Sequence, residues 1–174
     1  PRIAPEKIRL VANSFSSNTI AADGWHPKHF GLLSNGALEY LSLLLSEIEK
    51  VGQFPEVLQS LLIGLIAKPQ GGTRPIGYFR TFYRIWSKCR KEYYRHWEKQ
   101  AEDDGSKRLF ASGVNRSCTD VVWRQGAKAE LAGASGRRAA TTLHDIKKCF
   151  EAVTHFRLWE QAKNMHYTLT LLSV

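Results

Sequence analysis

The chain lacks several features that would narrow its class at once. No run of about 18 apolar residues occurs in its 174 residues, so no segment is predicted to span a membrane. Cysteine is scarce. The chain has an odd number, three, which are widely spaced and form no CxxC pair: Cys89, Cys118 and Cys149. This pattern indicates neither a disulfide framework nor a zinc site, and it favours a reducing, intracellular compartment.

Acidic residues are few relative to basic ones. The chain has 16 Asp and Glu against 25 Lys and Arg, a formal net charge of +9 and a pI near 9.6. A balance of this kind predicts a polyanionic partner. With 43% hydrophobic residues over this length, the chain can bury a sizeable core, and it is either one domain or part of a larger one.

A short apolar stretch in the middle of the chain predicts a β-hairpin. Leu61–Ala67 is too short for an ordinary helix and favours a strand, Gln70–Gly72 favours a turn, and Thr73–Gly77 can pair back on the first strand. Lys68 and Arg74 then flank one tight turn. Two cations beside accessible backbone N–H groups suit a triphosphate. A solvated basic turn is the alternative interpretation.

The positive charge is concentrated in one segment. From residue 68 to residue 99, nine Lys or Arg stand against only two Glu, so this segment carries +7 of the total +9. Within it, apolar residues recur at steps of three or four, at Phe79, Phe82, Trp86, Cys89, Tyr93 and Trp97. Basic residues recur at similar steps, at Arg80, Arg84, Lys88, Lys91, Arg95 and Lys99. One helix would bury the first series and expose the second, which we call the basic stripe.

The basic stripe has more than one interpretation. A cationic helix face suits the phosphate backbone of a nucleic acid, which gives affinity without reading sequence. The same pattern is compatible with an ordinary solvated helix face, or with a surface that packs against an acidic partner protein. The near absence of acidic residues among the basic ones favours nucleic acid.

The flanking segments predict mainly helices. Pro5–Ala12 favours a short helix, and apolar residues at helical spacing favour a longer one between a cap at Ser34 and a stop at Gly52. Residues 21–30 are predicted to be a loop. Near the C-terminal end, Thr141–Asp145 favours a strand and Phe156–Met165 a helix.

The hairpin residues, LIAKPQGG and TRPIG, followed by an aromatic and arginine-rich helix, resemble the fingers of reverse transcriptases of the non-LTR retrotransposon and group II intron kind. The resemblance implies that Arg74 contacts the phosphates of the incoming nucleotide and that Lys68 is the basic end of the first strand. Ala67 stands where that family often has proline.

Two further segments carry the resemblance. Residues 23–27, DGWHP, are similar to a structural segment ahead of the fingers in this family. Arg116, Ser117 and Asp120 are similar to its Gly-Arg-Ser-Thr-x-Asp segment, with Cys118 in the usual threonine place. The Ser117–Asp120 turn can also cap a helix that begins near Val121, which is enough to explain Ser117.

The stretch DIKKCFEAV resembles the first catalytic motif of the palm. A lone aspartate at a strand end is usually a turn or cap residue, but the match implies that Asp145 binds two Mg²⁺ ions, with the carbonyl of Ile146 as a further ligand. Two hard cations need oxygen ligands to activate a primer hydroxyl and to neutralise charge at phosphorus. Phe150 matches the steric gate that selects deoxynucleotides. His144, directly before Asp145, stands where this family usually has an apolar or aromatic residue.

Taken together, the resemblance implies an α+β fold, with N-terminal helices and right-hand polymerase fingers over residues 1–139 and the beginning of the palm over 140–174. The implied activity is RNA-directed DNA synthesis, with an RNA template, a DNA primer and deoxynucleoside triphosphates as partners. No aromatic-x-Asp-Asp turn occurs before Val174. The chain is therefore expected to be a fragment that cannot polymerise alone. The alternatives are a basic nucleic-acid-binding module or relic without catalysis, and a purely structural domain.

Overall fold

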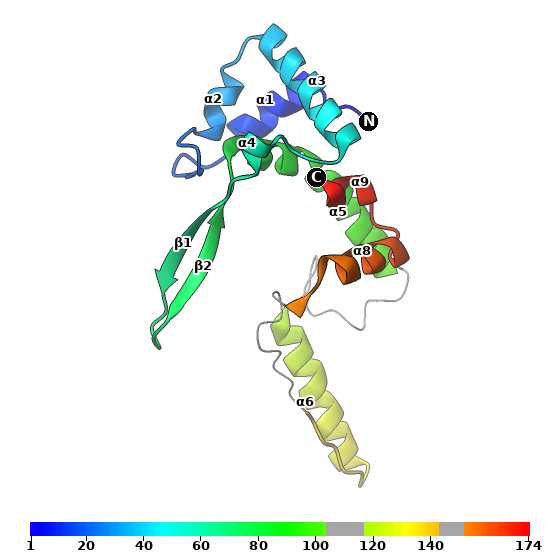
Figure 1. Ribbon diagram of the computed structural model, residues 1–174. Helices are drawn as coiled ribbons and strands as arrows, with labels where there is room; N and C mark the ends of the chain where they lie inside the picture. The colour runs from blue at the N-terminus through cyan, green and yellow to red at the C-terminus, as the bar shows by residue number, and fades with distance from the viewer. Residues whose placement is uncertain (104–116, 143–151) are drawn as a thin grey trace. The chain divides into compact units, whose positions relative to one another are not determined.

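The computed structural model describes residues 1–103, 117–142 and 152–174 (Figure 1). The described chain is mixed α and β, mostly helical, with one two-stranded antiparallel sheet, which confirms the α+β class at this level. No helix within these ranges is long and apolar enough to cross a membrane. The chain divides into two compact units, residues 1–94 with 168–174 and residues 95–167. The predicted boundary between fingers and palm at residue 139 stays a prediction.

The first unit contains most of the regular structure. Its elements are α1 (Pro5–Asn13), α2 (Pro27–Gly31), α3 (Asn35–Val51), α4 (Glu56–Gln59), β1 (Leu62–Ala67), β2 (Thr73–Tyr78), most of α5 (Thr81–Asp103) and α9 (Leu169–Ser173). The predicted cap and stop of α3 are confirmed. Ser34 Oγ accepts a hydrogen bond from the Ala37 N–H at 3.2 Å, and Gly52 ends the helix in the left-handed region at φ 73°.

The prediction of an unbroken loop over residues 21–30 is wrong in its second half, where α2 begins at Pro27. Proline at the first helical position gives up no helix hydrogen bond and has the required φ already fixed. His26 caps this helix: its Nδ1 accepts from the Lys28 N–H at 3.1 Å, and its Nε2 lies 3.0 Å from the Ser16 carbonyl oxygen. Both ring nitrogens of His26 are thus used to hold the local fold.

The core of the first unit joins α1, α3 and α5. It contains Ile3, Ile8, Val11, Ala12, Leu38, Leu45, Ile48, Phe54, Ile85, Trp86 and Cys89. The predicted buried series is confirmed at Trp86 and Cys89, whereas Phe79, which precedes α5, is 45% exposed and Tyr93 37% exposed. Burial raises the pKa of the Cys89 thiol from 9.0 to about 11, so this side chain is a protonated packing residue at neutral pH.

The second unit contains α6 (Cys118–Ala134) and α8 (His155–Asn164). The predicted cap at Ser117 is confirmed as a full capping box: Ser117 N–H donates to Asp120 Oδ2 at 2.9 Å, and Asp120 N–H donates to Ser117 Oγ at 3.3 Å. The helix begins at Cys118, three residues before the predicted start. The predicted strand is not found at residues 141 and 142, and its remaining residues, 143–145, lie outside the described chain.

Candidate nucleotide and nucleic-acid interface

The predicted hairpin is present, with β1 and β2 antiparallel. Its register pairs Leu62 with Tyr78 at one end and Ala67 with Thr73 at the other. The connecting turn is closed by two backbone bonds, from Lys68 N–H to the Gly72 carbonyl at 3.0 Å and from Gly71 N–H to the Lys68 carbonyl at 3.1 Å. Gly71 and Gly72 have φ values of 90° and 81°, which side chains disfavour, so both glycines are required by the turn.

The register brings the two predicted phosphate-binding cations to the same end of the hairpin. Arg74 lies directly opposite Ile66, and Lys68 follows Ile66 by two residues. Lys68 directly follows the end of β1, so both cations lie at the turn end of the hairpin. Both are exposed. Among the described hydrogen bonds, none uses the N–H groups of Gln70 or Gly72, which lie between the two cations in the chain.

The hairpin carries little packing of its own. Leu62, Ile63, Leu65 and Ile66 are between 49% and 66% exposed. An isolated two-stranded hairpin is marginally stable in water, so local contacts matter. The Tyr78 ring covers Gly64 so closely that a Cβ there would lie 2.5 Å from a ring carbon. This contact replaces the side chain that Gly64 lacks.

The basic stripe divides into residues that hold the fold and residues that do not. Arg84 donates to the Ile20 carbonyl, and its guanidinium carbon lies 5.7 Å from the centre of the Phe15 ring. Lys88 Nζ lies 3.1 Å from the Ser14 carbonyl oxygen and 4.1 Å from the centre of the same ring. These two cations fasten the segment after α1 to α5. Their predicted role at nucleic acid stays a prediction.

Other members of the basic stripe differ from this pair. Arg80 donates to Ser60 Oγ from Nε at 2.8 Å and from Nη2 at 2.6 Å. Lys91 and Arg95 are exposed and have no hydrogen bond or ion pair within the described chain. They lie four residues apart on α5, one helical turn. Lys99, four residues further along, is likewise exposed and has no such bond within the described chain, so these three are the stripe residues most available to a ligand.

One cation of the basic segment, Arg90, is buried, so its charge is not accessible to a ligand. Arg90 forms a two-pronged ion pair with Glu49 of α3, with Arg90 Nε donating to Glu49 Oε1 at 2.6 Å and Nη2 to Oε2. The two side chains are only 8% and 14% exposed. Trp86 Nε1 also donates to Glu49 at 2.8 Å, and Arg90 Nη2 donates to the Pro1 carbonyl at 2.8 Å. Sequence reasoning missed this pair because Arg90 lies off the basic stripe.

Asp23, from the DGWHP segment, caps α5 from a distance of 58 residues in the sequence. Its Oδ2 accepts from the Thr81 backbone N–H at 2.9 Å, and its Oδ1 lies 2.8 Å from the Thr81 hydroxyl. The Trp25 N–H donates to the same carboxylate at 3.2 Å. A negative charge at the first turn also interacts favourably with the helix dipole. The segment therefore sets the point at which the chain leaves the hairpin and enters α5.

Replacing Asp23 with alanine is expected to lower the free energy of unfolding by about 1–2 kcal/mol, the typical cost of losing a helix cap. Urea denaturation followed by circular dichroism measures this change. Glu160→Ala, at an exposed position of α8, is the control and should lie within about 0.5 kcal/mol of the original chain. An Asp23→Ala chain as stable as the control would show that the cap contributes nothing.

The predicted catalytic residues Asp145, Ile146 and Phe150 lie outside the described residues. Within the described ranges, no group of three or more His, Cys, Asp or Glu side chains is placed to hold a metal ion. The structure therefore leaves the predicted magnesium site, its two ions and the steric gate as predictions from sequence.

Comparison of the chain with protein-family models, with curated proteins and with solved structures gives no match.

Proposed function

We propose that this chain is the N-terminal part of a retroelement reverse transcriptase, which binds a deoxynucleoside triphosphate, an RNA template and a DNA primer. The observation that carries the proposal is the hairpin, in which exposed Lys68 and Arg74 flank the Gly71–Gly72 turn at one end. Triphosphate oxygens are matched by an ammonium, a guanidinium and backbone N–H donors in this arrangement.

The proposal assigns the chemical step to residues beyond the hairpin. The Asp145 carboxylate and the Ile146 carbonyl are hard oxygen donors of the type that Mg²⁺ prefers, so they suit this ion. One carboxylate is too few for two ions, and the remaining ligands would come from later motifs of a complete enzyme. The bound ions would supply charge neutralisation at phosphorus. In the proposal, Lys68 and Arg74 orient the triphosphate, and Phe150 excludes a ribose hydroxyl.

Binding of a fluorescent deoxynucleoside triphosphate in the presence of Mg²⁺ tests the proposal. Lys68→Ala and Arg74→Ala are each expected to weaken binding by roughly tenfold or more, because a hydrogen bond to a charged group contributes about 1.5–3 kcal/mol. Fluorescence anisotropy titration gives the dissociation constants. Lys50→Ala, at an exposed position of α3, is the matched control and should bind like the original chain. Equal binding by all four chains would contradict the proposed role of the hairpin.

A second candidate function is a nucleic-acid-binding module without catalysis. It is favoured by Lys91 and Arg95, which are exposed and have no ionic partner in the described chain. Such a module would bind nucleic acid with strong salt dependence and would show no magnesium-dependent binding of a nucleotide. The nucleotide titration above therefore separates the two candidates.

A further inference from the structure

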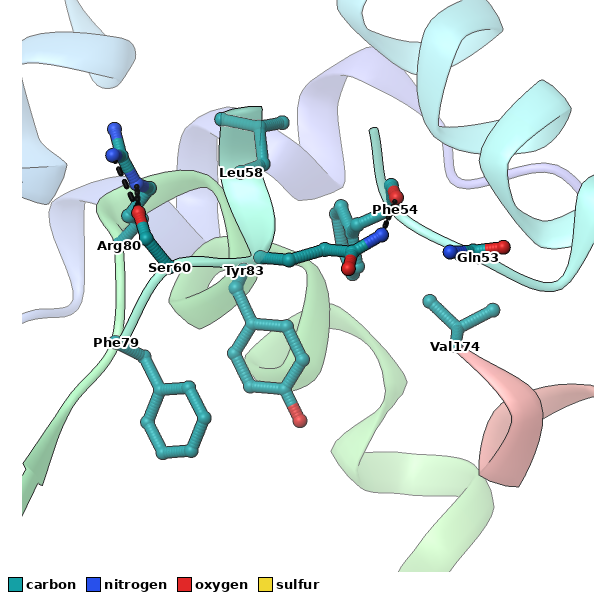
Figure 2. A pocket seen from close by; sticks show the side chains of 9 residues that line it. Gln53, Phe54, Leu58, Ser60, Phe79, Arg80, Tyr83 and Val174 are labelled. Carbon is teal, nitrogen blue, oxygen red and sulfur yellow. Dashed lines mark hydrogen bonds between the residues drawn. The ribbon is translucent and has the colours of Figure 1, made fainter. Parts of the chain in front are cut away.

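A cavity of about 360 Å³ lies in the first unit, where α4, the segment before β1 and the start of α5 meet. Figure 2 shows its lining, which includes Phe54, Leu58, Ser60, Phe79, Arg80 and Tyr83. We call it the α4–α5 pocket. Its volume falls within the range of about 300–1,000 Å³ that is typical of small-ligand sites. All the residues that line it belong to the same compact unit.

Two aromatic rings form one wall of the pocket. The ring centres of Phe79 and Tyr83 are 4.7 Å apart and their planes are inclined by only 20°. The two rings are therefore stacked, and Figure 2 shows both among the side chains that line the pocket. Tyr83 is fixed from behind by the Phe54 ring at 5.5 Å and the Trp86 ring at 5.6 Å. The result is a stacked aromatic pair with Tyr83 packed against the core and with Phe79, its more exposed member, 45% exposed.

Polar groups border this surface. Arg80 lies at the rim, and its bonds to Ser60 use Nε and one Nη2 proton (Figure 2). The guanidinium group has five N–H donors, so three stay available to an anion. Gln59 donates from Nε2 to the Phe54 carbonyl at 2.6 Å. Its side-chain oxygen makes no hydrogen bond within the described chain and is free to accept one. A stacked aromatic pair, an amide acceptor and a cation thus border one opening.

We infer that the α4–α5 pocket holds one unpaired base of a single-stranded nucleic acid, with the adjoining phosphate on Arg80. Every base has a flat face that can stack on an aromatic ring, and such stacking is tolerant of sequence. An aromatic side chain of a protein could also enter the opening. The concentration of +7 within residues 68–99, which include Phe79, Arg80 and Tyr83, favours the phosphate-bearing ligand. The inference takes its ligand class from the proposed function and adds a base-binding site to it.

The test compares a short single-stranded oligonucleotide with one of equal length made entirely of abasic units, which keeps the phosphates and removes the bases. The full chain is expected to bind the base-bearing strand about tenfold more tightly, because stacking contributes about 1–3 kcal/mol per base. Phe79→Ala should abolish this preference and leave the affinity for the abasic strand unchanged. Fluorescence anisotropy at fixed salt measures all the affinities.

Two further variants make the outcome specific. Phe79→Trp keeps a flat ring and should keep the preference, whereas Tyr40→Ala removes a 77%-exposed aromatic ring of α3 and should also leave the preference intact. A preference that persists in Phe79→Ala would overturn the inference, as would equal binding of the two strands by the original chain. Neither result would touch the proposed nucleotide site at the hairpin, because that site is measured with a free triphosphate and the Lys68 and Arg74 variants.

Discussion

Replacing Glu49 with alanine is expected to lower the free energy of unfolding by about 3–5 kcal/mol, the cost of breaking a buried ion pair from one side. The substitution leaves Arg90, 8% exposed, with its charge uncompensated among apolar neighbours. It also removes the acceptor of the Trp86 indole N–H. Urea denaturation followed by tryptophan fluorescence measures the change, since Trp86 lies in the same cluster.

Two comparisons separate the buried charge from the loss of a carboxylate in general. Glu47→Ala removes an exposed partner of Lys50, whose side chains are 62% and 68% exposed, and should cost less than about 1 kcal/mol. The double substitution Glu49→Leu, Arg90→Met replaces the pair by apolar groups and should recover most of the loss. If Glu49→Ala cost no more than Glu47→Ala, the Arg90 charge would have to reach water, which contradicts the packing described above.

Reversing the charge of Lys91 and Arg95 together, as Lys91→Glu, Arg95→Glu, is expected to weaken binding of an RNA/DNA primer–template by about 100-fold, since each hydrogen bond from a charged donor contributes about 1.5–3 kcal/mol. The slope of log affinity against log salt should become shallower by about 2, because two phosphate contacts are lost. Anisotropy titrations at several salt concentrations provide both quantities.

Lys91 and Arg95 are chosen because their charges can be reversed without breaking a contact that holds the fold. Arg84 and Lys88 hold the Phe15 segment, so changing them would alter the fold together with the charge. Lys50→Glu, Lys163→Glu makes the same change in net charge on other helices and should reduce affinity far less. Equal losses in the two double variants would show that binding depends only on overall charge and would remove the basic stripe as a specific surface.

Local chemistry made much of the fold predictable. The cap at Ser34, the stop at Gly52 and the Gly71–Gly72 turn each depend on residues close in sequence, and each is confirmed. The start of α2 at Pro27 was not predicted, because proline is found both where helices end and at their first position, and the residue alone does not distinguish the two.

The contacts that position the candidate site were less accessible to sequence reasoning. Asp23 and Thr81 are 58 residues apart, and Glu49 and Arg90 are 41 apart, so neither pair could be recognised from spacing. Helical periodicity placed Arg84 and Lys91 in one basic stripe. Of these two, Arg84 contacts Ile20 and Phe15, whereas Lys91 makes no such contact within the described chain. The α4–α5 pocket was missed for a similar reason, because its residues come from separate segments.

The separation of Glu49 from Arg90 also affects how the chain is made. The α3 helix is complete at Val51, but its partner on α5 is synthesised later. At translation rates of about 5–20 residues per second, those 41 residues take roughly 2 to 8 s. During that interval the Glu49 carboxylate lacks its Arg90 and Trp86 donors, and the apolar side chains of α1 and α3 have no α5 to cover them. The apolar faces of α1 and α3 are therefore exposed to water for at least this interval, which is when the nascent chain is most open to aggregation.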